Sequence, residues 1–188
     1  MLAPMRTPRA RGGSGLRTIL RLAVPGVLAG AAGTAAMTTS AHLNRVRYAR
    51  RHGLAPSEIT EILDYDDSEY VVIAASTLLR GVVGRAPASD GGRRALFLVV
   101  HWGYGSAVGI AHAALRRWVV GEPLAGSLFF VGCQTMCLTL FPVLGGTPVP
   151  WRWQRSVMAT SLGQHVLYSA VVAATAAGFR RVGTYPAG

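Results

Sequence analysis

The chain carries little charge. Charged residues make up 14% of its 188 residues, whereas a soluble domain has about 25%. There is no lysine, and only eight acidic residues stand against 19 arginines. The charge deficit argues against an ordinary soluble domain. The missing lysine is typical of a biased genomic base composition and indicates nothing about mechanism.

Four long segments contain no Asp, Glu, Lys or Arg at all. They are Leu22–Asn44, Ala95–Leu115, Pro123–Trp151 and Ser156–Phe179, with lengths of 23, 21, 29 and 24 residues. A transmembrane helix needs about 20 apolar residues to cross a hydrocarbon core about 30 Å thick. The pattern therefore predicts an all-α integral membrane helix bundle with four transmembrane helices.

Cysteine is scarce, because only Cys133 and Cys137 are present. Two cysteines do not make a disulfide framework. They lie four residues apart, which places both on one face of a helix. Helix geometry disfavours a direct disulfide between them, so they indicate nothing decisive about the redox compartment.

Net charge is +11 and the isoelectric point is about 11.2, a balance also found in nucleic-acid-binding proteins. The arginines lie in the breaks between the apolar segments, and no zinc-finger spacing or recognisable nucleic-acid motif is present. Arginine at the ends of membrane helices meets anionic headgroups. The expected partners are the lipid bilayer and anionic headgroups that bind the Arg-rich segments. Another membrane protein is a further expected partner, and nucleic acid is not.

The predicted organisation has five parts. A disordered basic tail covers 1–21, transmembrane helix 1 covers 22–43, an amphipathic loop region covers 44–94, transmembrane helices 2–4 cover 95–179, and a short tail covers 180–188. A cleaved signal peptide is the alternative for the first 41 residues. A retained helix is favoured, because the apolar stretch is long for a signal.

The loop region holds six of the eight acids, between Glu58 and Glu69. Only ten uncharged residues, Tyr70–Leu79, follow before Arg80, which is too short for a span. We expect an interfacial or re-entrant helix over 69–84 in preference to a fifth span, and a loop at "APASDGGRR". The acidic run lacks the spacing of a calcium-binding EF-hand, so pairing with arginines is favoured.

Glycines recur every four residues in two of the predicted spans. Gly26 and Gly30 form such a pair in the first span, and Gly105 and Gly109 form one in the second. Small residues at this spacing let helix backbones approach closely. The glycine face of the first span should therefore be covered by another span. Pro25 is expected in the first turn of its helix, where a missing N–H costs little.

Polar side chains inside the spans form a candidate intramembrane site. At 100° per residue, His101 and His112 lie within about 20° of one face, which Tyr104 shares. By depth, His101 and His165 enter the membrane about 9 and 13 Å from the same side, where His42 ends the first span. The candidate residues are His101, Tyr104, His112, Cys133, Cys137 and His165.

Three hypotheses compete for these residues. The favoured one makes the histidines neutral, structural groups that bond across helices, each bond contributing about 0.6–2 kcal/mol. In the second, they form a proton- or substrate-conducting site. In the third, they ligate haem or a soft metal together with Cys133 and Cys137.

No nucleophile elbow, phosphate loop or metalloprotease helix is present, so no catalytic residue, metal ligand or cofactor is assigned. We expect a non-enzymatic accessory or structural membrane subunit, with a small transporter or a redox protein as alternatives. The two sides of the membrane receive nine and ten arginines, which leaves the orientation open under the positive-inside rule.

Two motifs together, "GVLAGAAGTAAMT" and "HWGYGSAVGIAH", resemble the YagU-like group of small bacterial inner-membrane proteins. His101, Tyr104, Gly105 and Gly109 are the matching positions. His112 departs from the pattern, which has an aromatic residue there. The resemblance covers about a fifth of the chain and implies a multi-span bacterial membrane protein with no established activity.

Overall fold

The computed structural model describes residues 12–55, 68–146 and 148–182, without the side chains of 12–22, 68–70 and 145. The first part of the expected basic tail and most of the acidic run lie outside these residues. The elements are α1 (Gly12–His52), α2 (Ser68–Val83), α3 (Asp90–Leu115), α4 (Glu122–Leu140), a π-helical turn η2 (Phe141–Gly145), a 3₁₀ turn η3 (Pro150–Arg152) and α5 (Arg155–Arg181). No strand occurs in the described residues, and the all-α prediction is confirmed.

Three helices are long and apolar enough to cross a membrane, as expected of a membrane protein. They are Asp90–Leu115, Glu122–Leu144, which joins α4 to η2, and Arg155–Arg181. Asp90–Leu115 and Arg155–Arg181 contain the uncharged segments assigned to spans, and Glu122–Leu144 covers all but the last seven residues of Pro123–Trp151. The charge-free segments therefore located these helices correctly.

Helix α1 differs from the expected first span in its length. It has 41 residues, about 60 Å at 1.5 Å per residue, and it includes 12–21, which were predicted to be part of a tail. Pro25 lies inside the helix, so its predicted place in the first turn was wrong. The described part of α1 is built largely from Ala, Gly and Thr, and it is not among the three helices apolar enough to span.

Helix α3 begins five residues before the predicted second span. Ser89 is its N-cap, and the hydroxyl accepts a hydrogen bond from the backbone N–H of Gly92 at 3.2 Å. Asp90 lies in the first turn, where a negative charge interacts favourably with the helix dipole. The stretch from Asp90 to Arg94 is therefore helical, and the predicted loop is shorter than expected.

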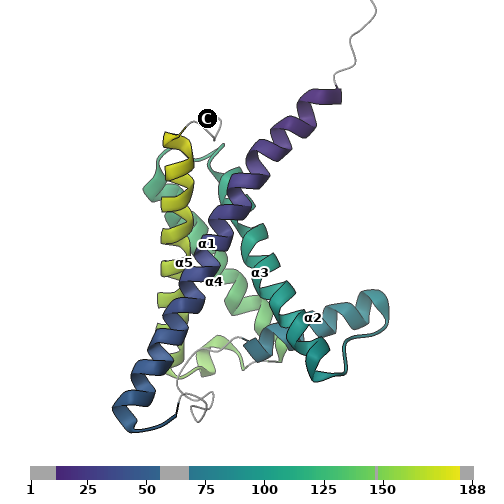
Figure 1. The fold of residues 1–188 in the computed structure, drawn as a ribbon, viewed down its shortest axis with the longest axis vertical. Coiled ribbons are helices and arrows are strands. Elements are labelled where there is room, and N and C mark those ends of the chain that lie inside the picture. The colour runs from purple at the N-terminus through teal and green to yellow at the C-terminus, as the bar shows by residue number, and fades with distance from the viewer. Residues whose placement is uncertain (1–11, 56–67, 147, 183–188) are drawn as a thin grey trace, which may run out of the picture.

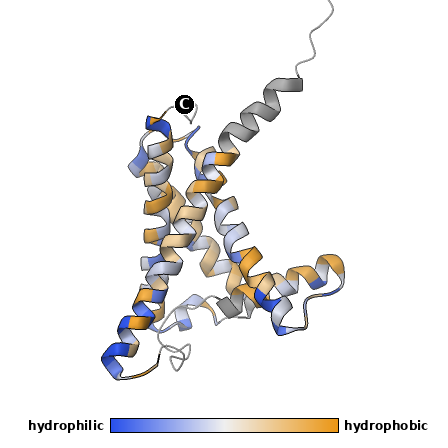
Figure 2. Cartoon of the chain, viewed as in Figure 1, coloured by the Kyte–Doolittle hydropathy of each residue, from blue (hydrophilic) through white to orange (hydrophobic). Residues whose placement is uncertain are grey.

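Four helices run along the long axis of the molecule, and α2 lies across one end (Figure 1). The start of α1 and the end of α5 lie at the opposite end. Apolar residues cover the middle of the bundle, while hydrophilic residues gather at the lower end of α1 and the upper end of α5 (Figure 2). Val71, Val72, Ala74 and Ala75 of α2 are buried, and α2 contacts α3 and η2.

Helices α1 and α3 cross at their glycines. A Cβ added to Gly26 would lie 2.8 Å from the Cα of Ile110, and one added to Gly30 would lie 2.9 Å from the Cα of Ser106. A Cβ on Gly109 would lie 2.7 Å from the Cα of Gly30. The two glycine pairs predicted from the sequence therefore face each other, and no larger residue fits between the backbones.

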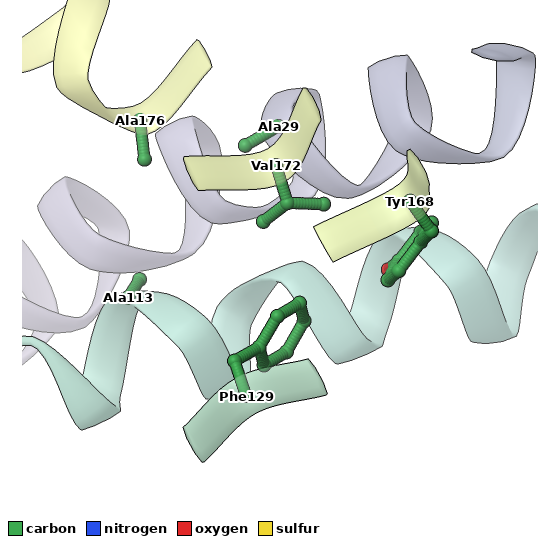
Figure 3. Close-up of a cluster of buried hydrophobic side chains, with 6 residues drawn as sticks. All are labelled: Ala29, Ala113, Phe129, Tyr168, Val172 and Ala176. Atoms are coloured by element: carbon green, nitrogen blue, oxygen red, sulfur yellow. The ribbon is translucent and has the colours of Figure 1, made fainter. Parts of the chain in front are cut away.

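The other helices complete a small core around this crossing (Figure 3). Its buried residues are Ala29, Ala113, Phe129, Tyr168, Val172 and Ala176, which come from α1, α3, α4 and α5. The rings of Phe129 and Tyr168 stack with their centroids 5.9 Å apart. Gly33 of α1 also packs here, because a Cβ at that position would lie 2.7 Å from the Tyr168 ring.

Candidate functional site

His101 joins α3 to α1. Its Nε2 lies 3.0 Å from the hydroxyl of Thr38, and that hydroxyl donates to the carbonyl of Thr34 at 2.9 Å. Because the hydroxyl proton is used in this way, the His101 Nε2–H is the donor in the bond to Thr38. The ring also stacks on Phe97, with centroids 5.1 Å apart. His101 thus links two helices.

Tyr168 makes a deeper link between α5 and α3. Its hydroxyl donates to the carbonyl of Gly105 at 2.6 Å, and both groups are buried. Because Gly105 has no side chain, the phenol reaches the backbone of the crossing. Tyr168 was not among the predicted site residues, because nothing in the sequence around it indicates a bond to the backbone of another helix.

Tyr104 contacts Met136, whereas Cys137 and His165 both contact Ser161. The hydroxyl of Tyr104 donates to the sulfur of Met136 at 3.7 Å, which joins α3 to α4. The sulfur of Cys137 lies 3.8 Å from the hydroxyl of Ser161. His165 Nδ1 lies 2.8 Å from the carbonyl of Ser161, so Nδ1 carries the proton and donates within α5.

Ser161 is the centre of the polar contact between α4 and α5. It is fully buried, and its hydroxyl accepts a hydrogen bond from the amide of Gln134 at 3.2 Å. Cys133 and Cys137 are both free thiols, and Cys137 is buried. In the described part of the chain, no three His, Cys, Asp or Glu side chains lie close enough together to hold a metal ion. Of the predicted site residues, His101 and Tyr104 therefore bond to other helices, while Cys137 and His165 both contact Ser161.

His112 is enclosed within the bundle, in the last turn of α3. Its side chain is 0% exposed, and its ring meets the Phe129 ring edge to face, with centroids 5.0 Å apart. No protein group forms a hydrogen bond with either ring nitrogen. Arg116 and Arg180 lie within electrostatic range of the ring.

Above His112, three charged side chains join the ends of three helices. We call Arg116, Glu122 and Arg180 the ion cluster. The Nε of Arg116 lies 2.8 Å from Oε1 of Glu122, and the guanidinium of Arg180 contacts the same oxygen. The three side chains are 18%, 30% and 22% exposed, respectively. The cluster fixes the end of α3 and the end of α5 to the first turn of α4.

Replacing His112 with leucine tests whether the buried imidazole lowers the stability of the fold. A buried polar group without a hydrogen-bond partner destabilises the folded state by about 1–3 kcal/mol. We expect His112→Leu to raise the free energy of unfolding in detergent by about 1 kcal/mol. Reversible unfolding followed by circular dichroism measures the change. A large loss of stability would show that the imidazole makes a contact that holds the bundle together.

No family model matches this chain, and neither does any curated protein or solved structure.

Proposed function

We propose that the chain is a non-enzymatic, multi-pass protein of a bacterial inner membrane that acts as an accessory or structural subunit. In this proposal α1, α3, α4 and α5 each cross the membrane once, with α1 as the fourth crossing, and α2 lies at one interface. Both ends of the chain then lie on the same side.

The observation that carries the proposal is how the polar groups of the interior are used. Tyr168 binds the backbone of α3, Thr38 binds His101, and Gln134 binds Ser161. Each of these bonds joins two helices. A catalytic or transport site presents its polar groups to a substrate, whereas these groups are engaged with one another. Their use supports a structural role for the interior.

The exterior of the bundle supports membrane insertion. Val99, Val131 and Val166 expose half or more of their surface near the middle of α3, α4 and α5. Apolar patches of this extent on a soluble monomer are rare, whereas lipid solvates them. Trp118 and Trp151 are 86% and 81% exposed, in the loops at opposite ends of α4. Tryptophan is enriched at both membrane interfaces.

Transport and redox activity receive no comparable support. Transport requires a water-filled cavity that touches His101 or His165. One groove of the described residues is lined by α1 and by Leu167, and this groove touches neither histidine. The resemblance to the YagU-like group is consistent with a multi-span membrane protein and adds no activity.

The proposal is tested by the size and composition of the protein purified in a mild detergent. A C-terminally tagged chain should elute in a defined complex with another membrane protein at fixed stoichiometry, measured by native electrophoresis and mass spectrometry. A tagged membrane protein of similar size and unrelated sequence is the control. A monodisperse particle that contains only this chain would contradict the accessory role.

A further inference from the structure

A groove runs along the second half of α1, beside α5. Its volume is about 430 Å³. The lining residues are a mixture of small, polar and aliphatic ones, and they are Ala35, Ala36, Thr39, Ser40, Leu43, Asn44, Arg47 and Leu167. All but one of them come from α1, where they recur every four residues (35, 39, 43 and 47, and 36, 40 and 44). The groove therefore follows the axis of the helix.

The polarity of the groove changes along its length. Ala35, Ala36 and Leu167 line one end, Thr39 and Ser40 follow, and Leu43, Asn44 and Arg47 line the other end, which carries the charge. An amphiphile has the same order of groups, with an apolar chain, then ester oxygens, then a charged headgroup.

The length and position of the groove match one leaflet of a bilayer. Ala36 and Arg47 are eleven residues apart, which is about 16 Å along a helix. This is about half of a hydrocarbon core about 30 Å thick. Arg47 lies just beyond the charge-free segment that ends at Asn44, so it falls at the predicted interface. Leu167 lies twelve residues into α5, at a similar depth to Ala36.

The charge near the groove selects for an anion. No acidic residue precedes Glu58 in the sequence, so nothing acidic on α1 competes for Arg47. Arg45, Arg50 and Arg51 add positive charge to the same end of the helix. A guanidinium pairs well with phosphate oxygens, and cationic residues near a membrane surface attract anionic lipid by about 1 kcal/mol each.

From this arrangement we propose that the groove binds one anionic phospholipid. The phosphate pairs with Arg47, the glycerol esters lie along Asn44 and Ser40, and an acyl chain covers Ala36 beside Leu167. The inference rests on the part of the proposed function in which α1 crosses the membrane. It does not depend on the accessory role.

The test measures which lipid stays on the purified full-length chain. The protein is incorporated into nanodiscs of equal parts phosphatidylglycerol and phosphatidylcholine, extracted with mild detergent, and examined by native mass spectrometry. We expect the wild-type chain to retain one phosphatidylglycerol molecule. Arg47→Gln should lower that retention about fivefold, and Ala36→Leu, which fills the apolar end, should lower retention of the acyl chain as well.

Arg50→Gln is the matched control, because it removes an equal charge from the same helix outside the groove lining. It should leave retention close to that of the wild type. Equal loss in the two arginine variants, or equal retention of both lipids by the wild type, would overturn the site. Displacement by inorganic phosphate would do so as well, since it would show binding of a free anion.

Folding and insertion are checked separately. Each variant is compared with the wild type by circular dichroism and by its yield in nanodiscs. A chain that does not enter nanodiscs at all contradicts the membrane crossing itself. A chain that enters nanodiscs but shows no lipid preference contradicts only the groove. Loss of the helical signal in Ala36→Leu leaves Arg47→Gln to decide the outcome.

Discussion

Gly109→Leu should unfold the bundle or destabilise it by about 3 kcal/mol. A Cβ at this position would lie 2.6 Å from the backbone nitrogen of Gly30 and 2.7 Å from its Cα. Backbone atoms do not move aside as a flexible side chain does, so α1 and α3 would have to separate. Unfolding in mixed detergent micelles, followed by tryptophan fluorescence, measures the loss.

Gly103→Leu is the matched control on the same helix. Gly103 is exposed, and a Cβ there meets no atom within 4 Å. Both substitutions add the same side chain to α3 and raise its helix propensity equally. We expect the control to unfold like the wild type. If Gly109→Leu is as stable as Gly103→Leu, the crossing of α1 and α3 at their glycines is wrong.

Glu122→Gln should lower the free energy of unfolding by about 2 kcal/mol. An exposed ion pair contributes about 0–1 kcal/mol, and breaking a buried pair costs about 3–5 kcal/mol. The ion cluster is partly exposed, so its loss should lie between these values. The substitution keeps the shape of the side chain and removes its charge. Arg116 and Arg180 then face each other without the carboxylate that both contact. Like charges held together in a partly buried place repel.

Two comparisons isolate the ion cluster. Arg117→Gln removes an exposed charge beside the cluster and should change stability by less than about 0.5 kcal/mol. The double variant Glu122→Gln with Arg180→Gln should lose less than the sum of the single losses, because the second change removes one of the repelling cations. An additive result in this cycle would mean that Glu122 and Arg180 do not interact.

The positions of three helices could be read from the sequence, and so could the glycine faces of α1 and α3, but not that these two faces meet each other. Charge-free segments located α3, α4 and α5, because a helix in lipid excludes charge. The glycine spacing on α1 and α3 identified the faces that meet, because only glycine allows such a close backbone approach. The ends of α1 were missed because the arginines near each end were interpreted as signs of a tail or a loop. Arginine is a good helix former, and the helix continues through both segments.

The contacts of the candidate site residues could be predicted less well from the sequence. Depth along a span placed His101 and His165 at one level, but depth gives no information on how each helix is rotated about its axis. His101 contacts α1, whereas His165 donates within α5. The ion cluster was missed because Arg180 is far from Glu122 in the sequence. An arginine at the end of a predicted span is also typical of an ordinary contact with lipid headgroups, so it did not indicate an ion pair.

Labelling of single cysteines tests most directly whether α3 and α4 cross the membrane. With Cys133→Ser and Cys137→Ser as background, cysteine is introduced by Arg50→Cys, Arg117→Cys or Arg152→Cys. A membrane-impermeant maleimide is then added to sealed vesicles. Positions 50 and 152 should react from one side of the membrane, and position 117 from the other. Reaction of all three from the same side, or recovery of the chain in the soluble fraction, would contradict the account.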